Sequence, residues 1–145
     1  MYGRILIATD GSDLSDKAVD QGLALAKALG GKVTMLRVTS QPAPMVYEGV
    51  MVALPIEEIS QEIAKSVEKY FMTLRGKASA LGIDAETIQI ENDFPWQVII
   101  DTARDKGAGL IVMASHGRRG LSAVLLGSET QKVLTHSTIP VLVCR

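Results

Sequence analysis

The segment at residues 114–128, ASHGRRGLSAVLLGS, gathers the residue types that bind phosphate. Its glycines let backbone N–H groups approach an anion closely, and Arg118 and Arg119 supply positive charge beside them. An apolar run at 110–113 precedes it, and a helix is expected to begin at Ser128. The unpaired amides and positive dipole end of that helix would add further donors. This arrangement predicts a nucleotide-binding loop.

This loop has two interpretations. It carries none of the well-known phosphate-binding signatures, so its role must be judged from its residues alone. Neither GxxxxGK[ST] nor a GxGxxG after the first expected strand occurs, which excludes a P-loop NTPase and the dinucleotide fingerprint. In the alternative interpretation, the glycines only make turns and Ser128 caps the next helix, with Gln131 at the capping-box spacing. Capping and anion binding use the same donors, so both can hold.

Three other residues carry chemistry. Asp10 follows the first expected strand, where its carboxylate suits a ribose hydroxyl or an adenine amine, or alternatively caps the following helix. His116 lies inside the loop, yet no serine–histidine–acid spacing accompanies it, which favours a hydrogen bond to backbone or phosphate over catalysis. Cys144 is the only cysteine and lies in an apolar run, which predicts a small buried hydrophobe in a protein from a reducing compartment.

Size and composition limit the class of protein. The 145 residues suit one domain, expected to span 1–145, and the net charge of −1 argues against a nucleic-acid surface. No apolar run is long enough to span a bilayer, and early aspartates interrupt the N-terminal apolar stretch that a signal peptide would need. We therefore expect a cytoplasmic protein that contacts neither membrane nor nucleic acid.

Short apolar runs alternate with helical patterns along the chain. Strands are expected at 4–9, 33–38, 85–91, 110–114 and 140–144, with helices that begin near residues 13, 55, 95 and 128. This alternation predicts an α/β fold: a five-stranded parallel, doubly wound, Rossmann-like sheet of order 3-2-1-4-5 with helices on both faces. Asp10 and residues 114–120 then share one sheet edge, at the carboxyl ends of the strands.

Two further stretches give expectations that a structure can test. In the helix that begins after Pro55, apolar residues at steps of three and four predict one continuous buried stripe. The stripe comprises Ile56, Ile59, Ile63, Val67, Tyr70, Phe71, Leu74, Ala78 and Leu81. Residues 40–54 combine two prolines with many apolar side chains, which leaves three interpretations open: a lid over the site, a patch that meets a partner, or a loop packed on its own domain.

The whole chain resembles the universal stress protein family. Family members that bind ATP carry G-x2-G-x9-G-[ST] after the fourth strand, and this sequence matches at Gly117, Gly127 and Ser128, with Ala114 in place of the first glycine. The flanking stretches IVMASHGRRG and IPVLVCR, and the end of the first strand in TDGS, also resemble the family.

The resemblance implies a site and a function. It places adenine and ribose beside Ala8, Thr9 and Asp10, the base on Val38, the ribose side on Met113 and Ala114, and the phosphates among Gly117, Arg118, Gly127, Ser128 and Glu129. The implied ligand is ATP, or AMP or ADP, with Mg²⁺ or Mn²⁺. The implied protein is a regulatory stress-response homodimer, paired through its last strand, with slow or no hydrolysis. A weak ATPase, a phosphoryl or adenylyl transferase, and an interaction module without nucleotide remain the alternatives.

Overall fold

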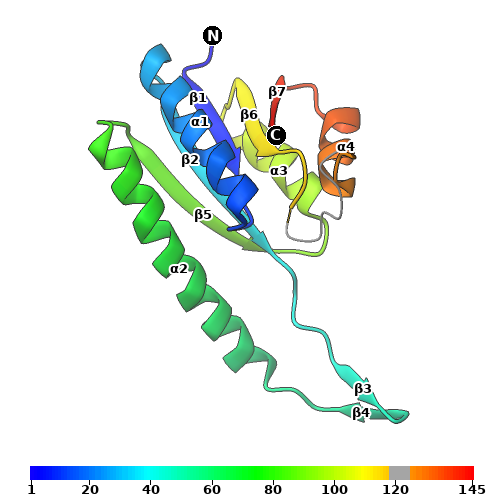
Figure 1. Ribbon diagram of the computed structural model, residues 1–145. Coiled ribbons are helices and arrows are strands. Elements are labelled where there is room, and N and C mark those ends of the chain that lie inside the picture. The colour runs from blue at the N-terminus through cyan, green and yellow to red at the C-terminus, as the bar shows by residue number, and fades with distance from the viewer. Residues whose placement is uncertain (118–124) are drawn as a thin grey trace.

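A five-stranded parallel sheet forms the centre of the computed structural model, which describes residues 1–117 and 125–145 (Figure 1). Its order is β5-β2-β1-β6-β7, and every pair of neighbouring strands is parallel. The strands are β1 (Arg4–Ala8), β2 (Lys32–Thr39), β5 (Ala85–Glu91), β6 (Leu110–Ala114) and β7 (Val141–Cys144). Counted in chain order without the short hairpin described below, this is the predicted 3-2-1-4-5 order, so the fold-class prediction is confirmed.

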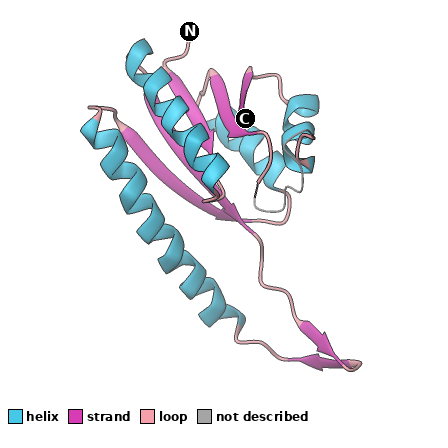
Figure 2. Ribbon diagram, in the orientation of Figure 1, coloured by secondary structure: helices cyan, strands magenta, loops and turns pink. Residues whose placement is uncertain are grey.

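Helices cover both faces of the sheet (Figure 2). The helices α1 (Asp13–Leu29) and α2 (Ile56–Ala80) pack on one face, and α3 (Pro95–Asp105) and α4 (Ser128–His136) on the other. Side chains of β1 alternate between the two layers: Ile5 and Ile7 enter the α1/α2 core, whereas Leu6 and Ala8 enter the α3/α4 core. Among the described residues, no helix combines the length and apolarity needed to cross a bilayer.

The helix α2 is buried over only part of its length, which corrects the predicted continuous stripe. Val67, Phe71, Leu74 and Ala78 are buried, whereas Ile56 near the N-terminal end is 41% exposed. The cause is geometric. A helix of 25 residues is roughly 37 Å long, whereas the seven residues of the neighbouring β5 span roughly 23 Å. The first turns of α2 therefore extend past the sheet.

Residues 45–52 form a hairpin that we call the arm, built from β3 (Met45–Tyr47) and the antiparallel β4 (Val50–Val52). It projects away from the sheet, beyond the first turn of α2 (Figure 1). Every residue of both strands is exposed, so the interpretation of this segment as a loop packed on its own domain is wrong. The arm also points away from the strand ends that carry the predicted site, and it does not form a lid over them.

Candidate functional site

The ends of β1 and β6 lie side by side and bring two of the predicted site residues together. The two strands pair from Ile5–Leu110 to Ile7–Val112, so the residues that follow them meet at one edge. A Cβ atom built on Gly117 would lie only 2.4 Å from Oδ2 of Asp10. A side chain at position 117 would therefore force the Asp10 carboxylate to shift.

Asp10 shapes the turn that follows β1. Its Oδ1 accepts a hydrogen bond from the backbone N–H of Ser12 at 3.0 Å. The cap of α1 is Ser12 itself, whose hydroxyl accepts from the amide of Ser15 at 3.2 Å. The alternative role of Asp10 as the helix cap is therefore wrong, and Asp10 instead directs Oδ2 toward the loop at Gly117.

Thr9 turns its side chain away from this edge, into the layer of α1 and α2. Its hydroxyl lies 3.0 Å from the Ser15 hydroxyl and 2.9 Å from the Tyr70 hydroxyl. The Tyr70 hydroxyl in turn donates to Asp16. Thr9 also donates its amide to the carbonyl of Leu36 at 3.0 Å, so its described donors are used inside the fold.

Tyr70 is a polar anchor that sequence reasoning missed, because its place in an apolar stripe predicts a core residue. Burial, and then the hydrogen bond to Asp16, raise the pKa of Tyr70 to about 12. The phenol therefore stays protonated and joins α2 to the end of β1. Only the tertiary fold brings Tyr70 and Thr9 together, since 61 residues separate them.

Small and apolar side chains lie beneath the strand ends that form this edge. Ala8 and Met113 are buried in the α3/α4 core, and Val38 packs against it half-buried. Ala114 lies in the opposite core, together with Leu110 and Cys144, so its methyl group is directed into the α1 layer. Burial raises the pKa of the Cys144 thiol, as expected for the predicted small buried hydrophobe.

The first turn of α4 is fixed against the end of β6. The amide of Gly127 donates to the carbonyl of Ser115 at 2.7 Å, and the hydroxyl of Thr130 donates to the carbonyl of Ala114 at 2.9 Å. A Cβ on Gly127 would lie 3.1 Å from Cα of His116, a tight contact with backbone that would displace one of the two segments by a few tenths of an ångström. These contacts form a continuous rim from Asp10 through Gly117 and His116 to the start of α4.

Ser128 does not cap α4, which corrects the capping-box prediction. The N-cap is Gly127, with extended φ and ψ of −62° and 154° and no side-chain cap. Ser128 is the first helical residue, and the Gln131 side chain donates to the carbonyl of Leu126 at 3.4 Å. Within the described residues, the amides of Ser128, Glu129 and Thr130 have no hydrogen-bond acceptor. Three donors are thus available at this helix end.

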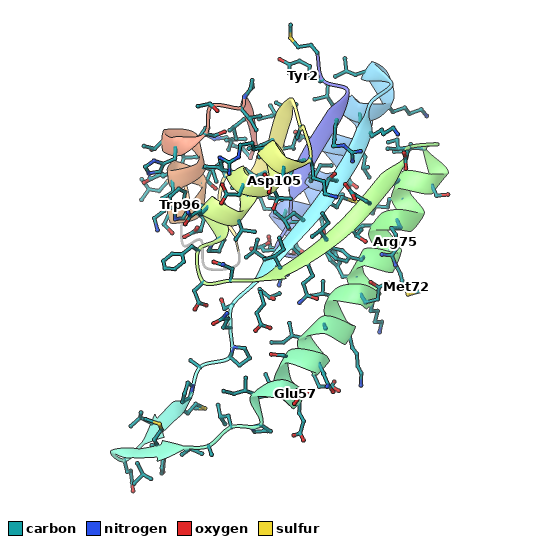
Figure 3. The ribbon with its side chains drawn as sticks, turned by 180° about the vertical axis from the view of Figure 1, so that it is seen from behind. Tyr2, Glu57, Met72, Arg75, Trp96 and Asp105 are labelled. Atoms are coloured by element: carbon teal, nitrogen blue, oxygen red, sulfur yellow. The ribbon has the colours of Figure 1, made fainter. Side chains whose placement is uncertain are left out.

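Glu129 faces away from the rim. Its Oε2 accepts from the amide of Trp96, in the first turn of α3, at 2.9 Å, and Oε1 lies 3.5 Å from Nζ of Lys132. The Trp96 ring lies 4.7 Å from the His136 ring between centroids, which adds a second contact between these helices. Figure 3 shows Trp96 at the α3–α4 boundary. The carboxylate of Glu129 therefore holds α3 to α4.

Comparison of the chain with models of protein families identifies its relatives. The model of the universal stress protein family matches residues 1–145. The chain belongs to this family. It is therefore a stress-response protein of the universal stress protein family, and the predicted resemblance is confirmed.

Relatives and solved structures agree with this assignment. Universal stress protein YxiE from Bacillus subtilis (strain 168) is 37% identical, with both chains fully covered. Universal stress protein MJ0531 from Methanocaldococcus jannaschii is 32% identical over all of this chain and 83% of its own.

Among solved structures, MJ0577 superposes with a TM-score of 0.83 at 24% identity, covering 99% of this chain and 96% of its own. A universal stress protein solved in complex with cAMP superposes with a TM-score of 0.73 at 23% identity, covering 99% and 97%. At these identities, the two superpositions support the fold.

The structure brings most of the predicted universal stress protein site to one edge. Ten of the eleven residues are described, and Arg118 lies outside the described residues. The side chains of Thr9 and Glu129 point elsewhere, as given above. Within the described part of the chain, no three His, Cys, Asp or Glu side chains gather as a metal site. Two shallow depressions of the described surface lie along α2, one of them lined by Ile59 and Ile63.

Proposed function

We propose that this universal stress protein binds an adenine nucleotide, ATP or its products ADP and AMP, at the rim between β1, β6 and α4. The observation that carries the proposal is a set of three amides, those of Ser128, Glu129 and Thr130, which have no acceptor in the described part of the chain and follow Gly127 at the end of a glycine-bearing loop. Such amides and the helix dipole favour phosphate. The cAMP complex of a structurally similar family member supports an adenine ligand.

Different parts of the rim contact the phosphates, the ribose and the base of the nucleotide. Phosphate oxygens accept from the α4 amides, while the exposed Ser128 hydroxyl adds a donor. Asp10 accepts from a ribose hydroxyl beside Gly117, where glycine permits the close approach. The base packs over the half-buried Val38, with Ala8 and Met113 buried beneath this side of the edge, an apolar lining of the kind found in most small-molecule sites. Thr9 contributes no side-chain contact to the ligand, since its hydroxyl belongs to the Tyr70 network.

The alanine at position 114 is compatible with this proposal. The family pattern has glycine there, and a methyl group directed at the ligand would narrow the site. The Ala114 side chain packs with Cys144 and Leu110 in the α1 layer, on the side of β6 opposite Met113. This direction of packing favours a nucleotide-binding protein over an interaction module without nucleotide.

A divalent cation, Mg²⁺ or Mn²⁺, fits this site only as a companion of the phosphates. The described residues offer no cluster of metal-ligating side chains, whereas Asp10 supplies a single carboxylate of the kind that Mg²⁺ prefers. The cation would neutralise phosphate charge. Fast phosphoryl transfer needs several charged groups arranged around the γ-phosphate. The sequence shows no obvious lysine, acidic pair or arginine finger arranged for this reaction, so the role that we propose is regulatory, with slow or no hydrolysis.

The homodimer through the last strand belongs to the same proposal. β7 ends the sheet next to β6, so its outer edge carries backbone groups without a strand partner among the described residues. Leu142, in the middle of β7, is 38% exposed. Pairing of two such edges about a twofold axis removes an aggregation-prone surface. A cytoplasmic location agrees with a single buried cysteine.

Native mass spectrometry of freshly purified protein tests nucleotide binding. We expect an adenine-nucleotide mass on the wild type and its loss in Ser128→Asp, because an anion placed at this position repels phosphate. The same acidic residue at a helix N-terminus stabilises the helix by roughly 0.3–1 kcal/mol, so the variant should remain folded. Thr73→Asp adds the same charge at an exposed position of α2 and should keep the ligand.

Calorimetry with added ATP and Mg²⁺ is the measurement that can contradict nucleotide binding. A wild-type protein that carries no nucleotide and gives no binding heat would support the interaction module instead. Gly127→Val should also abolish binding, because its Cβ would press on His116, while Gly76→Val in α2, where a Cβ meets open space, should retain it. Phosphate release that depends on Mg²⁺ and disappears in Ser128→Asp would indicate a weak ATPase.

A further inference from the structure

The arm at residues 45–52 is the most apolar exposed surface of the described chain. Seven of the fourteen large apolar side chains exposed in the described residues fall between positions 45 and 56. These are Met45, Val46, Tyr47, Val50, Met51, Val52 and Ile56. A contiguous exposed patch of this kind marks an interaction site rather than ordinary surface.

Both faces of the arm are apolar. A hairpin packed on its own domain would need apolar side chains on one face only. The register pairs Met45 with Val52 and Tyr47 with Val50 on one face, and Val46 with Met51 on the other. Met51 is 74% exposed. An isolated two-stranded hairpin is marginally stable in water, so packing against another surface would stabilise the arm.

The charges near the arm restrict the type of partner. Residues 40–54 hold one charged side chain, Glu48, at the turn. The first turn of α2 adds Glu57 and Glu58. A nucleic acid or an anionic membrane surface is recognised by lysine and arginine, and this segment contains neither. An uncharged apolar surface is the chemistry that fits.

The chain itself presents such a surface. The first half of α2 extends past the sheet and leaves Ile56 exposed, and Ile59 and Ile63 line a shallow depression beside it. In this part of the predicted stripe the domain leaves Ile56 exposed and buries Ile59 and Ile63 only in part. This part of α2 adjoins the arm in the sequence, and Figure 1 shows both at the same end of the molecule.

We propose that the arm is a self-association surface. The arm of a second copy pairs antiparallel along a strand edge of this arm, and an apolar face of each arm packs on the exposed start of the partner's α2. With a twofold axis, the arm and the exposed start of α2 are buried in both copies at once. Antiparallel pairing of the two arms also places the two Glu48 turns at opposite ends, where they do not repel each other. The outer edges of β3 and β4 supply the backbone groups for such pairing.

The available area suits a stable dimer. The seven side chains are between 40% and 74% exposed, so together they offer an apolar area on the order of several hundred Å² per copy, which is comparable with the roughly 800 Å² per partner of a standard interface. This surface is distinct from the β7 edge, which lies across the sheet from β5 and α2. It does not depend on nucleotide binding.

Sedimentation velocity over a range of protein concentrations tests the proposal. In the double variant Val46→Lys/Met51→Lys, like charges meet in the paired arms, and we expect the particle mass to fall to half that of the wild type. Met72→Lys is the matched control, because Met72 is 64% exposed on α2 outside the arm, and it should keep the wild-type mass. Urea unfolding of dilute protein, below the concentration at which the wild type assembles, should give the same midpoint for all three proteins, since these side chains are exposed in the single chain.

Two results would overturn the proposal. One is a wild-type monomer at every concentration, which would leave the arm to a different protein. The other is an oligomer that Leu142→Lys in β7 dissociates while the arm variant keeps its mass. Hydrogen exchange provides a second measurement: amides at 45–52 should be protected in the assembled protein and exchange freely in the arm variant. Free exchange in the assembled wild type would also refute arm pairing.

Discussion

At the scale of single residues, Gly117 and Gly127 act through distance rather than through backbone freedom. Gly127 has φ of −62°, which any residue can adopt, yet a side chain there would press on His116. Gly117 leaves space for the carboxylate of Asp10. The spacing of these glycines in the sequence predicted where the loop lies, but not why glycine is needed, because the reason is contact with residues that the fold brings near.

We predict that Gly117→Ala weakens nucleotide binding by about tenfold or more. Its new methyl group would lie 2.4 Å from Oδ2 of Asp10, so the carboxylate must move away from the position in which it accepts a ribose hydroxyl. A lost hydrogen bond to a charged group is worth about 1.5–3 kcal/mol. Titration calorimetry measures the change, with Gly76→Ala as a control that meets open space. Unchanged affinity in Gly117→Ala would remove Asp10 from the site.

For Glu129 we predict an effect on stability rather than on affinity. Its carboxylate accepts from the amide of Trp96 and lies near Lys132, so Glu129→Ala leaves the first turn of α3 without this acceptor. Loss of such a cap costs about 1 kcal/mol of unfolding free energy. Urea unfolding followed by the fluorescence of Trp96, the single tryptophan, measures this loss. A large fall in nucleotide affinity at unchanged stability would instead place Glu129 on the ligand.

At the scale of elements, sequence periodicity predicted the helices and strands well but not how much of each face is covered. Strands buried on both sides are apolar throughout, which is why β1 and β6 were recognisable. Burial of α2 depends on where the sheet ends, which no local pattern encodes. Ser128 was mistaken for a cap because Gly127 takes that position through backbone conformation alone. The polar role of Tyr70 likewise arises from contact with a residue 61 positions away.

The link between α2 and β1 gives a pH-dependent prediction. Since the pKa of Tyr70 rises from 10.0 to about 12, the folded state holds the phenol proton more tightly than the unfolded state. This contribution to stability is complete below pH 10 and is lost as the pH rises through 12. We expect the urea midpoint of the wild type to fall more steeply over this interval than that of Tyr70→Phe.

Tyr70→Phe should also lower stability at neutral pH by roughly 0.5–1.5 kcal/mol, because the hydrogen bonds to Thr9 and Asp16 are lost. An absorbance titration of phenolate gives an independent readout. One of the three tyrosines of the wild type should titrate near pH 12, and this step should be absent from the variant. An identical high-pH step in both proteins would contradict the assignment to Tyr70.

At the scale of the whole molecule, the chain separates into a packed layer structure and a projecting arm. The rim joins β1, β6 and α4, all of which lie within the packed layers, whereas the arm is attached through β2 and α2 (Figure 1). The sequence showed that residues 40–54 are too apolar for a solvated linker. It left their position open, because the same composition suits a lid, a packed loop or an interface. The exposure of both faces of the arm favours the interface.

This separation predicts that nucleotide stabilises the packed layers with or without a functional arm. A ligand at a hundred times its Kd adds about 2.7 kcal/mol to the unfolding free energy. For a chain of 145 residues this corresponds to a rise in Tm of roughly 5–10 °C. Differential scanning calorimetry at increasing ATP should show this rise in the wild type and in Val46→Lys/Met51→Lys alike, and not in Ser128→Asp. If the arm variant lost the shift while its fold stayed intact, the rim and the arm would be coupled, and nucleotide would bind across the assembled pair.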